Sequence, residues 1–112
     1  LIPLFLNSLD VLVIVNRLSD FGNFSYPVKL YEAMSCRVPV VATDTGPARW
    51  ILGNREQSLA APEDPLDLAR RTQALLSLGR ADYGCANTWE HSSELFERAL
   101  LAERDSPAPS LP

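Results

Sequence analysis

Residues 22–46 read GNFSYPVKLYEAMSCRVPVVATDTG, and this stretch carries the clearest structural pattern in the chain. Four of its residues recur at helical spacing and define one apolar face of a helix, namely Pro27, Leu30, Tyr31 and Met34. Residues 38–42 form a short apolar run rich in β-branched residues, which is typical of a parallel strand covered on both faces. Polar residues and Gly46 follow, at the point where open α/β sheets place a ligand crevice. The pattern therefore predicts a helix, a turn, a buried strand and a loop that borders a ligand site.

The start of the predicted helix suits a ligand that carries phosphates. Ser25 is a favourable N-cap residue, and Pro27 fits in the first turn because its missing N–H is not needed there. Free amides and the positive end of the helix dipole attract phosphate. Glu32 lies seven residues after Ser25, about 10 Å further along the axis, where its carboxylate could accept hydrogen bonds from two vicinal hydroxyls. The distance from Ser25 to Glu32 matches the length of a nucleoside diphosphate. Considered without other evidence, however, Lys29 and Glu32 are more simply explained as a charged pair on the helix surface.

The rest of the chain continues the alternation of strands and helices. Residues 11–15 form a strongly apolar candidate strand, residues 16–23 a polar loop, and residues 57–60 a weaker strand that we expect at a sheet edge. Helices are expected within residues 1–9, over residues 47–52, from Pro65 with Asp64 as N-cap, and from Trp89 to about Glu103 with Thr88 as N-cap. The expected buried sides are Leu4, Phe5 and Leu9 in the first helix, and Leu66, Ala69, Leu75 and Leu78 in the helix from Pro65. Three β units with helices between them predict an α/β fold, half of a doubly wound parallel sheet.

Composition and charge exclude several classes of function. The chain has 112 residues, 46% of them hydrophobic, which is enough for one globular domain. Its formal net charge is −4 and no basic stripe is present, so we expect no nucleic acid partner. Polar residues interrupt the apolar residues 1–15, which predicts neither a signal peptide nor a membrane span. The two isolated cysteines, Cys36 and Cys85, lack metal-ligand spacing and indicate a reducing, cytoplasmic compartment and no metal site.

Residues 22–46 resemble the nucleotide-sugar end of retaining GT-B glycosyltransferases of the group 1 family, also called family 4. That family typically has a glutamate, seven further residues, a second glutamate, and then Ala-Met-Ala-small-Gly-x-Pro-Val-Val-Ala. Residues 32–43, EAMSCRVPVVAT, match this motif nearly position by position. The resemblance implies that Glu32 holds the ribose hydroxyls of the donor. The implied donor nucleotide-binding set is Gly22, Asn23, Ser25, Tyr26, Lys29, Glu32, Thr45 and Gly46.

The resemblance also implies an architecture and an activity. Residues 1–104 would form the later part of a Rossmann-like, donor-binding domain with a parallel sheet of about three strands, and residues 105–112 a disordered tail. A complete enzyme of this kind needs a second, N-terminal acceptor-binding domain, so the chain is expected to be a fragment that is inactive alone. The implied reaction is hexosyl transfer from a UDP- or GDP-sugar to an unassigned acceptor, without a metal or further cofactor. No catalytic residue is assigned.

Three positions depart from the family pattern. Phe24 stands where the family has its first glutamate, Arg37 where it has a glycine after the helix, and Arg49 near the place of a glutamate in the following loop. At Arg37 we expect a left-handed backbone conformation at a cost of roughly 1 kcal/mol. These departures leave open a non-catalytic, degenerate domain that serves in binding or interaction. A receiver-like signalling domain is a third reading, which the lack of an acidic pair ahead of a phospho-accepting aspartate disfavours.

Overall fold

A three-stranded parallel sheet forms the centre of the protein. The structure is a computed structural model that describes residues 1–84 and 88–106. The strands are β1 (Leu12–Ile14), β2 (Val40–Thr43) and β3 (Leu59–Ala60), in the order β1-β2-β3. In this register Leu12 lies beside Val40, and Ala42 lies beside Leu59. The predicted α/β class, the three parallel strands and the edge position of the third are therefore confirmed.

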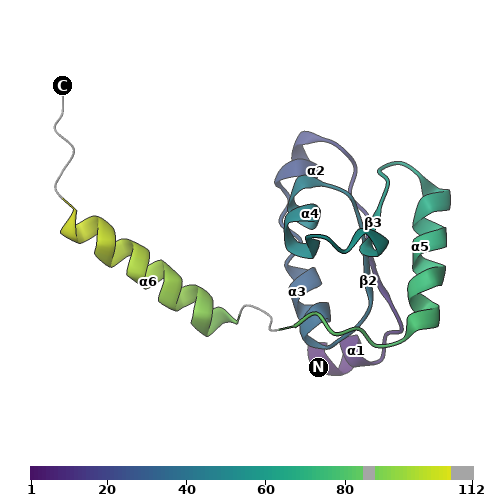
Figure 1. Ribbon diagram of the computed structural model, residues 1–112, viewed down its shortest axis with the longest axis horizontal. Coiled ribbons are helices and arrows are strands. Elements are labelled where there is room, and N and C mark those ends of the chain that lie inside the picture. Colours follow the sequence, from purple (N-terminus) through teal and green to yellow (C-terminus); the bar gives the residue numbers. More distant parts are fainter. Residues whose placement is uncertain (85–87, 107–112) are drawn as a thin grey trace.

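Helices cover both faces of this sheet (Figure 1). The helices are α1 (Ile2–Asn7), α2 (Asp20–Phe24), α3 (Val28–Ser35), α4 (Gly46–Leu52), α5 (Pro65–Leu78) and α6 (Trp89–Asp105), with a short 3-10 helix, η1 (Glu56–Ser58). α1, α3 and α4 lie on one face, and α5 packs on the other against β2 and β3. This layering buries β2 completely, because the central strand is paired on both edges and covered on both faces.

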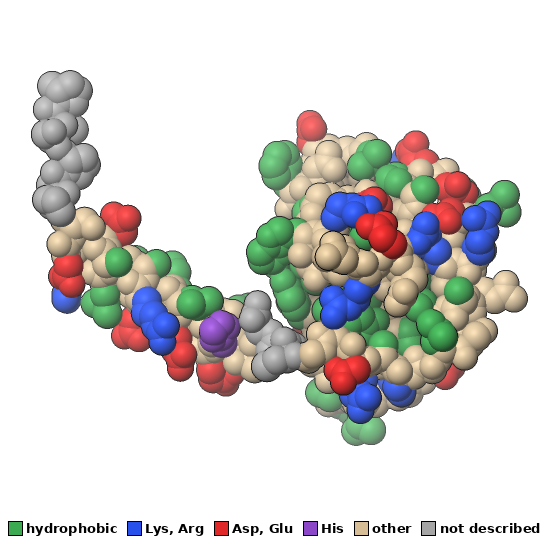
Figure 2. Space-filling view, in the orientation of Figure 1, with side chains coloured by type: hydrophobic (Ala, Val, Ile, Leu, Met, Phe, Trp, Pro, Cys, Tyr) green, Lys and Arg blue, Asp and Glu red, His purple; other side chains and the backbone are tan. Residues whose placement is uncertain are grey.

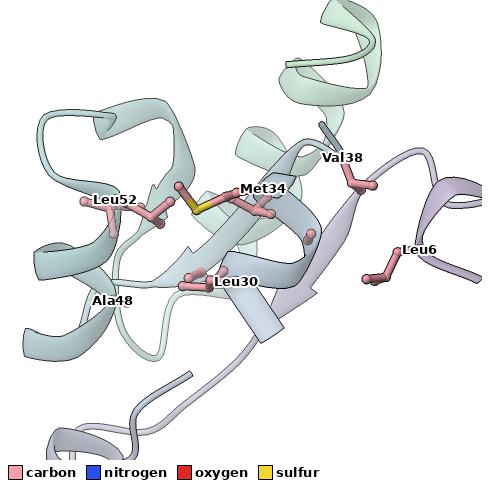
Figure 3. Close-up of a cluster of buried hydrophobic side chains, with 10 residues drawn as sticks. Leu6, Leu30, Met34, Val38, Ala48 and Leu52 are labelled. Atoms are coloured by element: carbon pink, nitrogen blue, oxygen red, sulfur yellow. The ribbon is translucent and has the colours of Figure 1, made fainter. Parts of the chain in front are cut away.

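The larger core lies between the sheet and α3. Leu30, Val38 and Leu52 have no exposed surface, and Met34 and Ala48 complete the contact between α3 and α4 (Figure 3). A smaller cluster on the other face joins Val41 and Ala60 to Leu75 of α5. Cys36 packs against the larger core, as expected of a structural thiol, while Cys85 lies outside the described residues.

The predicted start of α3 is wrong. Ser25 is not its N-cap but the residue that ends α2, and Pro27 occupies the N-cap position of α3. The predicted loop at residues 16–23 contains most of α2, whose first turn is capped by the Ser19 hydroxyl, which accepts from the Gly22 amide at 3.1 Å. The sequence-based reading missed this helix because a single turn is too short to show helical periodicity.

The other helix starts agree better with the sequence. The Asp64 carboxylate accepts from the Asp67 amide at 3.0 Å, and the Thr88 hydroxyl accepts from the His91 amide at 3.2 Å, so both predicted N-caps are confirmed. The predicted buried sides are partly wrong. Leu6 is buried in α1 and Leu75 in α5. The predicted buried residues that are instead exposed are Leu4, Phe5, Leu66, Ala69 and Leu78.

α6 stands apart from the rest of the protein (Figure 1). Within the described residues, no side chain of this helix is buried. Hydrophobic and acidic side chains alternate along its surface (Figure 2), and Leu95, Phe96 and Leu100 are all exposed. Residues 79–84 are irregular, and most of the predicted tail, residues 107–112, lies outside the described part. Neither α6 nor any other helix in the described ranges is both long and apolar enough to cross a membrane.

α3 ends in a Schellman motif that places Arg37 in the left-handed conformation. The Arg37 amide donates to the Met34 carbonyl and the Val38 amide to the Ala33 carbonyl, each at 3.0 Å. Arg37 has φ 60°, which confirms the expected left-handed residue. A Cβ atom is strained in this region, whereas glycine adopts it freely.

Replacing Arg37 with glycine is therefore expected to stabilise the protein. We expect Arg37→Gly to raise the free energy of unfolding by about 0.5–1 kcal/mol, after the extra freedom of glycine in the unfolded chain is subtracted. Denaturant titration of the wild type, Arg37→Gly and Arg37→Ala measures the effect. Arg37→Ala keeps the Cβ and should show no gain, so equal stability of the two variants would contradict the explanation.

Candidate functional site

Two adjoining hollows surround the start of α3. The first, here called the aromatic hollow, has a volume of about 390 Å³ and contains Glu32. Its remaining lining residues are Tyr26, Val28, Tyr31, Trp50, Trp89, Ser92 and Leu95. The second, the edge hollow, has a volume of about 490 Å³ and runs along β1 past Ser25 and Lys29. Tyr26 and Val28 line both hollows, so the two form one continuous depression.

Three aromatic side chains build one wall of the aromatic hollow. The ring of Tyr26 lies 6.1 Å from that of Tyr31 and 6.2 Å from that of Trp50, measured between centroids. The two tyrosine hydroxyls are 2.8 Å apart and share a hydrogen bond. Partial burial, followed by this hydrogen bond, raises the pKa of Tyr31 to about 12. Tyr31 is therefore neutral at physiological pH, and the pair offers a hydroxyl edge beside an apolar ring surface.

Glu32 projects from the outer side of α3. Leu30, Ala33 and Met34 occupy the buried side of the helix, so Lys29 and Glu32 lie on the solvent-facing stripe, three residues apart. Glu32 is exposed, and it lines the same hollow as Tyr26 and Trp50. An exposed carboxylate beside aromatic rings can accept hydrogen bonds from a ligand whose apolar face rests on the rings.

The predicted site residues divide into two groups. Ser25, Tyr26, Lys29 and Glu32 lie around the two adjoining hollows. Gly22 is buried within α2 and Asn23 is exposed on it, and neither lines these hollows. Thr45 is buried at the N-cap of α4, and within the described chain its hydroxyl has no hydrogen-bond partner. Gly46 is exposed, and a Cβ built there meets no atom of the described residues within 4 Å.

A third hollow lies at the carboxyl ends of the strands, where the sequence placed the ligand crevice. It has a volume of about 340 Å³, and its lining includes Asn16, Arg17 and Thr43. The Asn16 amide donates to the Thr43 hydroxyl at 3.2 Å, which joins the ends of β1 and β2. The lining set of this strand-end hollow contains no member of the predicted donor set. Glu32 is therefore adjacent to α4 and Tyr26 rather than inside the strand-end crevice.

A charged side chain in the first turn of α5, Asp67, holds the segment between β3 and α5. The Asp67 carboxylate accepts from the Ala61 amide and from the Arg71 guanidinium, both at 2.8 Å. The Ala61 amide, followed by Arg71, holds the pKa of Asp67 below its usual value. Asp67 thus fixes the exit of β3 to α5, which is a structural role that the sequence analysis did not assign to it.

Two aromatic residues are more exposed than the sequence suggests. From the sequence, Trp50 is expected to pack in the core, and Phe24 either in the core, which is favoured, or on a sugar face. In the structure they are 70% and 85% exposed, so core packing is wrong for both. For Trp50 a signal was present, because Ala48 and Leu52 lie one turn apart on the buried side of α4. The residue midway between them must point away from the core. Phe24 lies at the end of the short helix that the sequence analysis missed.

Arg49 bridges two carboxylates from different segments. Its Nε atom donates to Oδ1 of Asp44 at 2.8 Å, and its terminal nitrogens contact Oδ2 of Asp44 at 2.6 Å and Oε1 of Glu56 at 2.8 Å. Asp44 follows β2, and Glu56 begins η1. Hydrogen bonds from Arg49 lower the pKa of Glu56 from its ordinary value. The described residues contain no group of three or more side chains suited to hold a metal ion.

Residues 2–78 match a protein family described as glycosyl transferases group 1. No curated protein and no solved structure matches the chain. The match includes the sheet, α1 to α5, and the aromatic wall formed by Tyr26, Tyr31 and Trp50. It leaves out α6 and, with it, the part of the aromatic hollow that α6 lines. On the strength of a match over most of its length, the chain belongs to the group 1 glycosyltransferase family.

Proposed function

We propose that the chain supplies part of the donor site of a retaining GT-B glycosyltransferase, which transfers a hexosyl group from a UDP- or GDP-sugar. The observation that carries the proposal is the position of Glu32 in the same hollow as Tyr26, Tyr31 and Trp50, beside the start of α3. A nucleoside presents two vicinal ribose hydroxyls and a flat base. A carboxylate next to exposed rings matches both groups.

The diphosphate is assigned to the edge hollow. Lys29 lines it together with Ser25 and Pro27, at the positive end of α3. Glycosyl transfer from a nucleotide sugar releases a nucleoside diphosphate, whose negative charge must be stabilised as the bond to the sugar breaks. Lys29 and the helix start would supply part of that stabilisation, and Glu32 would hold the ribose about one turn further along the same helix. The acceptor and the residues that bind it belong to an N-terminal domain that we place outside this chain.

The test asks whether Glu32 recognises ribose hydroxyls. The dissociation constants of UDP and GDP are measured by calorimetry for the full chain and for Glu32→Ala, and each is compared with its 2′,3′-dideoxy analogue. A hydrogen bond to a charged acceptor is worth about 1.5–3 kcal/mol, so Glu32→Ala should weaken binding of the better ribonucleotide about tenfold or more. The wild type should prefer the ribonucleotide to its dideoxy analogue, and the variant should lose that preference.

The matched control is Glu97→Gln, because Glu97 is an exposed glutamate of α6 outside both hollows. It should leave all four dissociation constants unchanged. If Glu32→Ala binds UDP and GDP as tightly as the wild type, Glu32 has no contact with the donor. If it weakens the ribonucleotide and the dideoxy analogue equally, Glu32 contacts another part of the nucleotide and the ribose assignment fails.

A further inference from the structure

Arg49 lies on the exposed side of α4, and its guanidinium is engaged by two carboxylates. Both terminal nitrogens and Nε donate to carboxylate oxygens, with the shortest contact, 2.6 Å, to Asp44. These hydrogen bonds, first to Asp44 and then to Glu56, raise the pKa of Arg49 above its ordinary value. A cation neutralised by two acids attracts a phosphate weakly, since a ligand must compete with both partners. The role of Arg49 therefore lies in the link that it makes.

That link joins three segments around the outer side of α4. Asp44 belongs to the turn after β2, Arg49 to the middle of α4, and Glu56 to η1, which leads into β3. A single ion pair on the surface contributes little to stability. Arg49, however, pairs with two carboxylates and binds Asp44 through two hydrogen bonds, and networks with this bidentate geometry contribute more. The buried side of α4 consists of Ala48 and Leu52, with the partly buried Ile51 packed beside them. Arg49 is thus the contact that holds the exposed side of this short helix.

The residue next to Arg49 forms the aromatic wall. Trp50 is 70% exposed, and among the described residues its recorded aromatic contact is with Tyr26, at 6.2 Å between ring centroids. A large, exposed ring on a helix of two turns has few contacts of its own to fix its direction. We propose that Arg49 is a positioning residue: its ion pairs with Asp44 and Glu56 hold α4 so that the Trp50 indole stays against Tyr26 in the aromatic hollow. The consequence for ligands rests on the donor-site function proposed above.

The first test reads the position of Trp50 without any ligand. In a Trp89→Phe background Trp50 is the single tryptophan of the chain. Its acrylamide quenching constant and fluorescence anisotropy are compared between Arg49 and Arg49→Ala, with circular dichroism as the check on folding. We expect Arg49→Ala to raise the quenching constant and lower the anisotropy. Arg98→Ala, an exposed arginine of α6, is the control and should change neither. Unchanged quenching in Arg49→Ala overturns the proposal.

Two further variants separate positioning from general destabilisation. Arg49→Lys keeps the charge but cannot form the fork to both acids, so it should give an intermediate quenching constant. Glu56→Gln removes one of the two ion pairs and supplies the same readout if Arg49→Ala does not fold. A quenching constant that rises equally for Arg49→Ala and Arg98→Ala would also overturn the proposal, because the change would then not depend on the contacts of Arg49.

The second test connects the position of Trp50 to the donor site. With UDP and GDP as probes, Trp50→Ala should weaken binding about tenfold, as expected when a stacking ring is removed. Arg49→Ala should weaken it less, about fivefold, because the ring remains present but loosely held. If neither nucleotide binds the wild type, the donor function fails, while the fluorescence result still decides the role of Arg49. If both bind and Arg49→Ala leaves affinity unchanged despite altered quenching, the indole does not contact the nucleotide and the link to the donor fails.

Discussion

Gly22→Ala is expected to destabilise the protein severely, although the substitution adds one methyl group. A Cβ atom at this position would lie 1.9 Å from the Arg17 carbonyl oxygen and 3.1 Å from its carbonyl carbon. Both are backbone atoms, so the clash cannot be relieved by a side-chain rotation. Either α2 must move away from residues 17–19 or the helix must unwind. Overpacking of this kind costs about 3 kcal/mol or more, which is a large part of the stability of a domain of this size.

Gly46→Ala is the matched control for this experiment. Gly46 opens α4, and an added Cβ there meets no atom of the described residues within 4 Å. We expect Gly46→Ala to be neutral or to stabilise the protein by about 0.4–1 kcal/mol, because alanine restricts the unfolded chain. Urea titrations of the wild type and both variants measure the difference. Equal stability of Gly22→Ala and Gly46→Ala would show that the approach of Arg17 to Gly22 is not a constraint on the fold.

The close approach at Gly22 also bears on the strand-end hollow. Arg17 lines that hollow, and the adjacent Asn16 amide donates to Thr43 at the end of β2. The Arg17 carbonyl lies where a Cβ atom on residue 22 would be. Only glycine at this position therefore allows the loop after β1 to follow its observed path. The resemblance described in the sequence analysis placed Gly22 in the donor nucleotide-binding set. Within the described residues, the backbone that approaches it is that of Arg17.

Tyr83→Ala is expected to produce the second large loss of stability. The Tyr83 hydroxyl accepts a hydrogen bond from the Val40 amide at 2.9 Å. Val40 is the first residue of the central strand, and it has no exposed surface. The Arg55 guanidinium carbon lies 5.2 Å from the centre of the Tyr83 ring, and Arg55 also donates to the Tyr83 carbonyl at 3.2 Å. Truncation removes the packing of a half-buried ring, a cation–π contact and a hydrogen bond together. The expected cost is about 3 kcal/mol, measured by denaturant titration.

Tyr83→Phe isolates the hydrogen bond from the packing. It keeps the ring but leaves the buried Val40 amide without its acceptor, which is expected to cost about 1–3 kcal/mol. Burial raises the pKa of Tyr83 in the folded protein. Burial favours the neutral phenol, so the contribution of Tyr83 to the free energy of unfolding is complete below the ordinary tyrosine pKa of about 10. It is lost as the pH rises through the higher pKa that Tyr83 has in the folded protein. Tyr83→Phe should lack this alkaline component. A phenylalanine variant as stable as the wild type would show that the Val40 amide does not depend on Tyr83.

Local interactions explain which features could be predicted from the sequence. Residues 38–42 predicted a doubly covered strand because apolar β-branched runs of this length have few other uses, and β2 is fully buried. The caps at Asp64 and Thr88 were predictable because a cap bonds an amide two or three residues away. The left-handed Arg37 was expected because the family pattern that the sequence resembles has a glycine at this place, and the structure confirms it.

The candidate site could be predicted only in part. Glu32, Lys29, Ser25 and Tyr26 are neighbours in sequence and lie around two adjoining hollows, as expected from one helix start. Trp50 completes the wall from another helix, and its direction depends on which side of α4 is buried. Thr45 was predicted to face the donor, yet its position at the turn into α4 buries it. The burial of a residue in such a turn depends on how the turn lies on the sheet. A single sequence does not specify this position.

By itself, the sequence determined the order of the three strands and of the helices other than α2, the parallel α/β class and the helix that carries Glu32. These depend on periodicity, turn residues and capping, which act over a few residues. Only the tertiary structure decided that Tyr83 satisfies Val40, that Arg49 joins Asp44 to Glu56, and that Trp50 stands against Tyr26. Several of these contacts join segments separated by a strand or a helix. Such pairs meet only after the sheet has formed, so no local pattern in the chain specifies them.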